Sequence, residues 1–235
     1  MSKANRLRIG ATALVVLLGA LSGCQAVQNS TPTQTLVRVI DASYNAPAVD
    51  VKIGTTPIAT NIGAASITNY AFLPPQNTSA YIYPTGSTKS TASAAGTFLV
   101  DEQHSVLITD SGAGYAASIL ADQVTPPPAG DFSFRVVQQA IQAGAVDVYL
   151  LSGTTVLADA KPVLSGVVAQ TVSAYINVAA GTYTIAVTPA GSIKTAWTSA
   201  APVVFSNNQV RSFLVMDAQL TTNPPVTVVI GNDLN

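Results

Sequence analysis

The sequence predicts an all-β protein that contains two tandem β-sandwich domains. Only 9% of the 235 residues are charged, against about a quarter in an average globular protein. Small, β-branched and hydroxylated residues take their place, and these favour strands and turns over helices. Residues 49–53 (VDVKI) and 182–187 (TYTIAV) alternate in polarity, and Gly, Pro and Asn recur between such segments. No segment after Cys24 combines a helical period with caps, and the Ala-rich segment 111–121 comes nearest to one.

A duplication is visible in the opening segment of each predicted domain. Residues 38–51 (RVIDASYNAPAVDV) align without a gap with residues 135–148 (RVVQQAIQAGAVDV), 97 positions later. Near the other end of each copy, SVLITD at 105–110 parallels SFLVMD at 212–217. A period of this length is too long for a solenoid repeat and fits a duplicated domain.

The repeat and a proline cluster set the predicted boundaries. We expect the first domain over 36–124 and the second over 131–235, each an immunoglobulin-like or transthyretin-like β-sandwich. Residues 125–130 (TPPPAG) form a short, stiff linker, because consecutive prolines favour an extended helix and cannot enter a sheet interior. Each domain is long enough to bury a core without a metal or a disulfide.

The N-terminus has the organisation of a bacterial lipoprotein signal peptide, expected over 1–23. A basic start is followed by an apolar run over 9–20, which is too short to span a bilayer stably. The run Leu-Ser-Gly-Cys that ends at Cys24 resembles the lipobox, in which cleavage falls between Gly23 and Cys24 and the cysteine carries the lipid. The alternative is an ordinary signal peptide whose cysteine is incidental. Residues 24–35 then form the lipidated cysteine and a polar, flexible tether.

These features predict an exported protein in the cell envelope, attached to the membrane through its N-terminal lipid. Gln25 follows the cysteine where an Asp favours inner-membrane retention, so the outer membrane is the expected location. Seven basic and eleven acidic residues follow Cys24. With no basic stripe, nucleic acid is not an expected partner. The expected partners are an envelope protein or a polysaccharide.

The segment DASYNAPAVDV (41–51), the later Tyr-rich strand at 81–83 that runs into a Pro-x-Gly turn, and the tandem arrangement behind a lipobox resemble the DUF4397 family. This is a family of bacterial envelope proteins with no assigned activity, so the resemblance implies no catalytic residues. The first copy departs from the family at Tyr44, where Pro is common. The second copy departs from the family at three positions, Gln138, Ala140 and Gly144. This implies that any binding by this loop is confined to the first copy.

The inventory of reactive groups argues against an enzyme. His104 is the only histidine and Glu102 the only glutamate, and no zinc, hydrolase or nucleotide-binding motif is present. We expect no cofactor and no metal. His104 is expected to be a turn residue beside a strand. A weak hydrolase or the accessory subunit of an envelope enzyme, with a cleft near His104, is kept as an alternative.

Binding residues are expected in the first copy. Asp41, Ser43 and Asp50 lie in or beside the family segment, and calcium bound by Asp41 and Asp50 is the functional alternative to a structural role. Tyr81 and Tyr83 are two apart and so share one strand face, where they could form a glycan-binding surface of an adhesion protein. The leading hypothesis is a lipid-anchored envelope protein acting as a non-catalytic structural or binding module.

Overall fold

The computed structural model describes residues 34–112, 114–218 and 226–234. The predicted signal peptide, Cys24 and nearly all of the tether lie outside these ranges. Among the described residues the only helical element is one 3-10 turn, η1 (Leu157–Asp159), and the rest of the regular structure is strand. The all-β prediction is therefore confirmed. None of the described residues form a helix that could cross a membrane.

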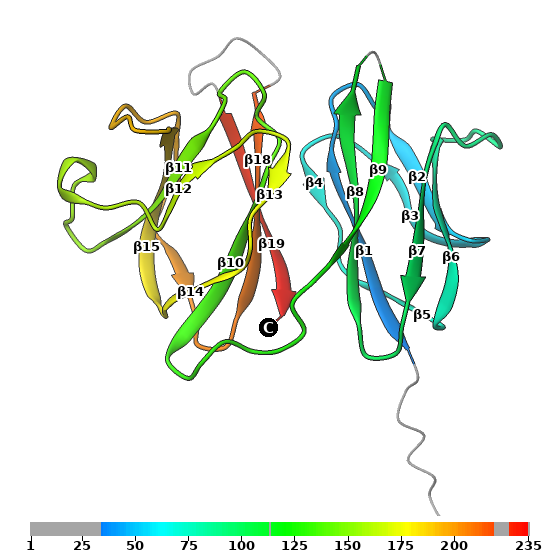
Figure 1. Ribbon diagram of the computed structural model, residues 1–235, viewed down its shortest axis with the longest axis horizontal. Coiled ribbons are helices and arrows are strands. Elements are labelled where there is room, and N and C mark those ends of the chain that lie inside the picture. Colours follow the sequence, from blue (N-terminus) through cyan, green and yellow to red (C-terminus); the bar gives the residue numbers. More distant parts are fainter. Residues whose placement is uncertain (1–33, 113, 219–225, 235) are drawn as a thin grey trace, which may run out of the picture. The chain divides into compact units, whose positions relative to one another are not determined.

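Residues 35–122, called here the first half, build two sheets that face each other as a sandwich (Figure 1). One sheet has the order β4-β1-β8-β9, and β5 also pairs with β1. The other has the order β3-β2-β6-β7. The strands are β1 (Thr35–Ala42), β2 (Val49–Ile53), β3 (Thr56–Ile62), β4 (Ser66–Ile67), β5 (Ala71–Leu73), β6 (Gln76–Pro84), β7 (Ala92–Phe98), β8 (Gln103–Ser111) and β9 (Gly114–Ala121).

Residues 131–234, the second half, repeat this plan. One sheet has the order β13-β10-β18-β19, and β14 also pairs with β10; the other has the order β12-β11-β15-β16, and β17 also pairs with β15. The strands are β10 (Asp131–Gln138), β11 (Val146–Ser152), β12 (Leu164–Val167), β13 (Thr171–Val172), β14 (Ile176–Ala179), β15 (Gly181–Pro189), β16 (Trp197–Thr198), β17 (Val203–Phe205), β18 (Val210–Asp217) and β19 (Val226–Leu234).

The two halves share strand directions and register as well as strand order. β1 pairs in parallel with β8, and β10 pairs in parallel with β18, whereas every other pairing is antiparallel among the described residues. In the second sheet Val49 faces Pro84, and in the equivalent pair Val146 faces Pro189. Equivalent positions in the two halves can therefore be identified strand by strand. The domain boundaries themselves stay a prediction.

Alternation along β1 sends its side chains into two different cores. Val37 and Val39 enter the core of the first sandwich, which β2, β6 and β8 complete. Ile40 and Ala42 point the other way, because successive residues of a strand face opposite sides, and they meet Val137, Leu214 and Met216 of the second half. The sheet of β1 and β8 is thus buried on both faces, which explains the near-continuous burial of β1.

The Ala-rich segment that came nearest to a helix in the sequence is strand β9, paired with β8 from His104↔Ala121 to Ser111↔Gly114. Small side chains allow this strand to lie close against β7 and the core, where Ile119 and Tyr115 pack. Tertiary pairing overrides the helical propensity of alanine here.

Candidate functional site

The loop after β1 is held by two carboxylates. Asp110, at the end of β8, accepts hydrogen bonds from Ser43 Oγ (2.6 Å) and from the backbone N–H groups of Tyr44 (3.4 Å) and Asn45 (2.8 Å). Asp41 Oδ1 accepts the N–H of Ser43 at 3.1 Å. Two of the predicted binding residues, Asp41 and Ser43, are therefore buried and hydrogen-bonded within this loop, and ligand binding by them stays a prediction.

Asp41 is an unusual component of this turn. The side chain is fully buried, and its Oδ2 has no hydrogen-bond partner among the described residues. Burial, with a further contribution from the nearby Asp110 carboxylate, raises the pKa of Asp41 to about 6, against an opposing hydrogen bond from Ser43. The equivalent residue of the second half is Gln138, whose Oε1 accepts the N–H of Ala140 and whose Nε2 donates to the carbonyl of Gly144.

Asp50 lies in β2, and its carboxylate accepts hydrogen bonds from other segments of the chain than Asp41 does. It accepts backbone N–H groups from Asn61 (2.8 Å) and Gly86 (3.2 Å), which, with the Thr85 hydroxyl, lower its pKa. Asn61 and Gly86 both have positive φ, and the carboxylate thereby joins an irregularity in the register of β3 to the turn after β6. No three side chains of His, Cys, Asp or Glu gather in the described ranges as metal ligands would.

Asp147, the equivalent of Asp50, makes the same bridge in the second half. Its two oxygens accept the N–H groups of Gly166 (2.7 Å) and Gly191 (2.8 Å), and both glycines again have positive φ. The Val-Asp-Val repeat in the sequence is thus explained by a carboxylate that joins an irregular edge strand to a turn in each half. The structure gives this motif a role in the fold of each half.

Tyr81 and Tyr83 lie on one face of β6, as their spacing predicts, and both are half-buried. Lys52 faces Tyr81 in register, and its Nζ lies 5.0 Å from the centre of the Tyr83 ring. On this face the second half differs, because register places Ala186 and Thr188, both buried, at the equivalent positions. The tyrosine face therefore belongs to the first half alone.

His104 lies inside β8 and is 5% exposed, so it is not the turn residue that the sequence predicts. Its ring packs edge-on against Phe98, with ring centres 5.2 Å apart. Its Nε2 lies 3.1 Å from Glu102 Oε2 but has no partner in hydrogen-bond geometry among the described residues. The sequence missed this burial because the polar run 101–103 precedes it.

The most elaborate polar cluster of the structure was not predicted from the sequence. In the first half, Ser105 Oγ accepts from Arg38 Nε (2.8 Å) and donates to Asp122 Oδ2 (2.6 Å), and the Tyr70 hydroxyl donates to the same Asp122 oxygen (2.6 Å). The guanidinium of Arg38 stacks over the Tyr70 ring at 4.7 Å. Arg38, Ser105 and Asp122 are all buried.

The second half contains the same four side chains in the same arrangement. Ser212 Oγ accepts from Arg135 Nε (2.9 Å) and donates to Asp233 Oδ2 (2.6 Å), and the Tyr175 hydroxyl donates to Asp233 Oδ2 (2.7 Å). Arg135 lies 4.8 Å over the Tyr175 ring. Burial is the main cause that raises the pKa of both tyrosines, which keeps them protonated donors.

Each arginine then crosses to the aspartate of the other half. Arg38 Nη2 donates to Asp233 Oδ1 at 2.7 Å, and Arg135 Nη2 donates to Asp122 Oδ1. Arg38 Nη2 also reaches Ser212 Oγ at 3.2 Å. We call these eight residues the crossed network, namely Arg38, Tyr70, Ser105, Asp122, Arg135, Tyr175, Ser212 and Asp233. Its sequence signal was the repeated Arg and Ser of the two copies.

Comparison with known proteins identifies one domain. Residues 35–149 match the family described as "Domain of unknown function (DUF4397)". The matched span covers the first half, the linker and the start of the second half. No curated protein matches.

Solved structures give only distant likenesses. The TIE protein of Bacillus anthracis is 10% identical with a TM-score of 0.24, covering 85% of this chain, which spans 44% of that protein. A family CBM26 module of Amy13K from Eubacterium rectale, in complex with maltoheptaose, is 8% identical with a TM-score of 0.26, covering 83% of this chain and 96% of the module. These scores are too low to argue a shared fold or ligand.

Proposed function

We propose that this chain, which carries a DUF4397 domain at residues 35–149, is a lipid-anchored cell-envelope protein whose folded part is a non-catalytic structural or binding module of two tandem domains. The observation that carries the proposal is the crossed network. Buried ion pairs lose solvation and tolerate one geometry only. A repeated, crossed set of them favours a rigid scaffold over an enzyme that must open and close.

The use of the acidic residues supports the same proposal. Asp110 and Asp217 fasten the loops after β1 and β10, since Asp217 accepts the N–H groups of Gln142 and Ala143. Asp50 and Asp147 each hold a turn glycine and an irregular edge strand. A general acid or base must be able to reach a substrate, and these carboxylates already accept hydrogen bonds from the protein itself.

The anchor is the part of the proposal that localisation tests directly. Wild type, Cys24→Ala and Ser22→Ala are compared in the producing cells by membrane fractionation and by protease treatment of intact cells. Ser22→Ala is the matched control, because it keeps a small residue before the cysteine. We expect wild type and Ser22→Ala in the outer membrane and Cys24→Ala in the soluble fraction. Equal partitioning of all three would contradict lipid anchoring.

A glycan-binding role is the second candidate, and the tyrosine face favours it. Tyr81 and Tyr83 present rings and hydroxyls beside the Lys52 ammonium, a combination of apolar faces and polar tips suited to sugar rings. We expect Tyr81→Ser and Tyr83→Ser each to weaken binding to a retained polysaccharide at least tenfold in affinity electrophoresis. Phe72→Ser removes an exposed aromatic elsewhere and is expected to leave binding unchanged.

A further inference from the structure

One end of the first half is apolar at the point where the chain enters the described structure. Phe72 is 71% exposed, Leu99 51% and Val100 43%. Leu36 is half-buried and faces Phe72 directly across the β1–β5 pairing. We call these four residues the apolar end.

Backbone hydrogen bonds hold this end in one piece. The N–H of Leu36 donates to the carbonyl of Glu102 at 3.0 Å, and the N–H of Asp101 donates to the carbonyl of Gln34 at 3.1 Å. The turn over 99–102 is closed by the N–H of Glu102, which donates to the carbonyl of Leu99 at 3.4 Å. Leu99 and Val100 therefore lie beside the first described residue of the chain.

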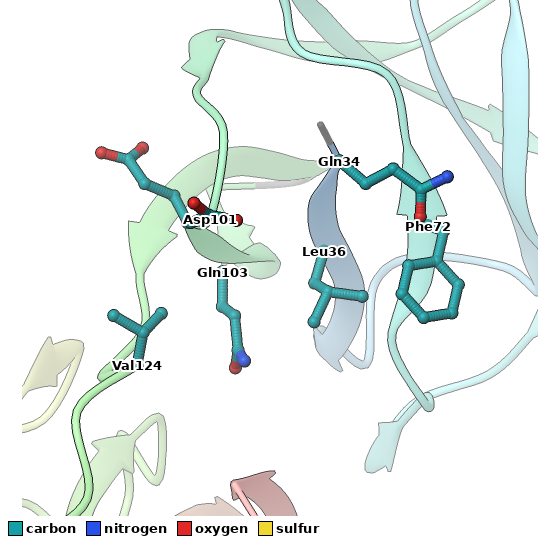
Figure 2. A pocket seen from close by; sticks show the side chains of 7 residues that line it. Gln34, Leu36, Phe72, Asp101, Gln103 and Val124 are labelled. Carbon is teal, nitrogen blue, oxygen red and sulfur yellow. The ribbon is translucent and has the colours of Figure 1, made fainter. Parts of the chain in front are cut away.

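A pocket of about 330 Å³ opens at this end (Figure 2). Figure 2 shows Leu36 and Phe72 along one wall, with Gln103 and Val124 across from them. Val124 is itself 41% exposed. The apolar end thus contains a pocket into which an acyl chain or an aromatic ring could insert.

The second half supplies an internal comparison, because the same three backbone hydrogen bonds recur there. The N–H of Ser133 donates to the carbonyl of Gln209 (2.8 Å), that of Asn208 to Asp131 (2.9 Å), and that of Gln209 to Ser206 (3.3 Å). Asp101 and Asn208 also share a positive φ, of 60° and 68°.

These equivalences show that the apolar character belongs to the first half alone. Ser133 stands in place of Leu36, and Asn177, which faces Ser133 in register, stands in place of Phe72. In the turn, Ser206 and Asn207 stand in place of Leu99 and Val100. At all four positions the half nearer to Cys24 in sequence is apolar and the other half is polar. The fold needs no apolar residue at these sites.

We propose that the apolar end contacts the surface of the lipid bilayer to which Cys24 is anchored. This inference rests on the proposed lipid anchor. Nine residues, 25–33, separate Cys24 from Gln34, so Gln34, which adjoins the apolar end, can lie at most about 35 Å from the lipidated residue. Exposed aromatic and aliphatic side chains at such a site partition into the interface between headgroups and acyl chains.

The acidic side chains at this end determine which lipid headgroups the apolar end can approach. Among the described residues that line the pocket, Asp101 and Glu102 are acidic and none is a lysine or an arginine. Anionic headgroups would therefore repel this end, whereas zwitterionic headgroups would not. The contact is apolar, and we expect it to persist at high salt, where electrostatic attraction is screened.

The test places a tryptophan at equivalent positions in the two halves. Lipidated full-length protein carrying Trp197→Phe and either Phe72→Trp or Asn177→Trp is reconstituted into phosphatidylcholine vesicles with brominated acyl chains. We expect at least twofold quenching of the tryptophan at position 72 and none at position 177. Should Trp197→Phe unfold the protein, the quenching of the parent Trp197 is measured and subtracted.

Flotation of the vesicles separates the two proposals. Protein that floats but is quenched at neither position, or equally at both, keeps its anchor and overturns the membrane contact. A blue-shifted, unquenched tryptophan at position 72 would mean that a second copy of the chain covers the apolar end, which also overturns the inference. Protein that does not float overturns the anchor, and the inference with it.

Discussion

The guanidinium of Arg38 in β1 donates a hydrogen bond at 2.7 Å to the carboxylate of Asp233 in β19, 195 residues later in the chain. The reciprocal pair joins Arg135 in β10 to Asp122, which directly follows β9. Each half thus supplies one cation and one anion to the other. Attraction from Asp233 and Asp122 outweighs the effect of burial and raises the pKa of Arg38, so the arginine stays charged.

Breaking one crossed pair is expected to destabilise the protein strongly. Arg38→Met leaves Asp233 buried with one charged partner fewer, and Asp233→Leu does the same to Arg38. Each is expected to lower the free energy of unfolding by about 3–5 kcal/mol. The double variant is expected to lose clearly less than the two single losses combined, since neither charge is then stranded. Urea denaturation of the four proteins measures this coupling.

Lys89→Met is the matched control for this cycle, because it removes an exposed cation of similar size. A change within about 0.5 kcal/mol is expected for it. Strictly additive losses for Arg38→Met and Asp233→Leu would show that the two side chains do not interact in solution.

Replacing Asp41 by Asn is expected to stabilise the protein above neutral pH. Burial, with Asp110 nearby, raises the pKa of Asp41 to about 6 in the folded state. Below the unfolded value near 3.8 both states are protonated, and stability is lost as pH rises from there through about 6. The amide mimics the neutral carboxyl and, like Gln138, offers a donor. We expect a gain of about 1–3 kcal/mol at pH 8 and almost none at pH 3.5.

Thermal or urea unfolding at these two pH values checks the prediction. Gln138→Glu is the reciprocal variant and is expected to introduce the same penalty above neutral pH. Equal stability of wild type and Asp41→Asn at pH 8 would mean that the Asp41 carboxylate is stabilised by groups beyond Ser43.

Asp50 is expected to show the opposite pH dependence. Backbone N–H groups of Asn61 and Gly86 lower its pKa. The stability it contributes is present above the unfolded value and is lost as pH falls through the lower folded value. Asp50→Asn should therefore lower the melting temperature at pH 7, and the difference from wild type should shrink as the pH falls below the unfolded value of 3.8. A difference that is constant with pH would mean that the charge of Asp50 is irrelevant.

Local features of the fold were predictable from the sequence, and long-range ones were not. Period-two alternation in 49–53 reflects a local property of strands, so the all-β class followed from it. The parallel pairing of β1 with β8 depends on groups far apart in sequence, which no local pattern encodes. The same holds for the site: Arg38 and Arg135 recur at the repeat spacing, but Asp122 and Asp233 fall outside the aligned segments, so their partnership was invisible.

The predicted binding residues show what residue type alone does not reveal, namely the hydrogen bonds that each side chain makes within the protein. Asp41 and Ser43 are hydrogen-bonded within the loop after β1, and Asp50 accepts backbone N–H groups from β3 and from the turn after β6. Ligand binding by these three residues stays a prediction. Carboxylates and hydroxyls that follow strands commonly serve turns in this way. Tyr81 and Tyr83 do share a face, because that expectation rested only on strand geometry.

Gly231 in β19 is expected to tolerate no larger side chain. A Cβ built at this position would lie 2.9 Å from Ile67 Cγ2 and 3.1 Å from Arg38 Nη1, both in the first half. Glycine therefore permits β19 to approach β4 closely enough for Arg38 to reach Asp233. We expect Gly231→Val to lower the free energy of unfolding by about 1–3 kcal/mol through overpacking.

Gly63→Ala is the control, because a Cβ at Gly63 has no atom within 4 Å and its φ is not positive. Chemical denaturation compares the two variants. A neutral Gly231→Val would show that the halves separate readily at this point, and the strong coupling expected between Arg38 and Asp233 would then fail as well.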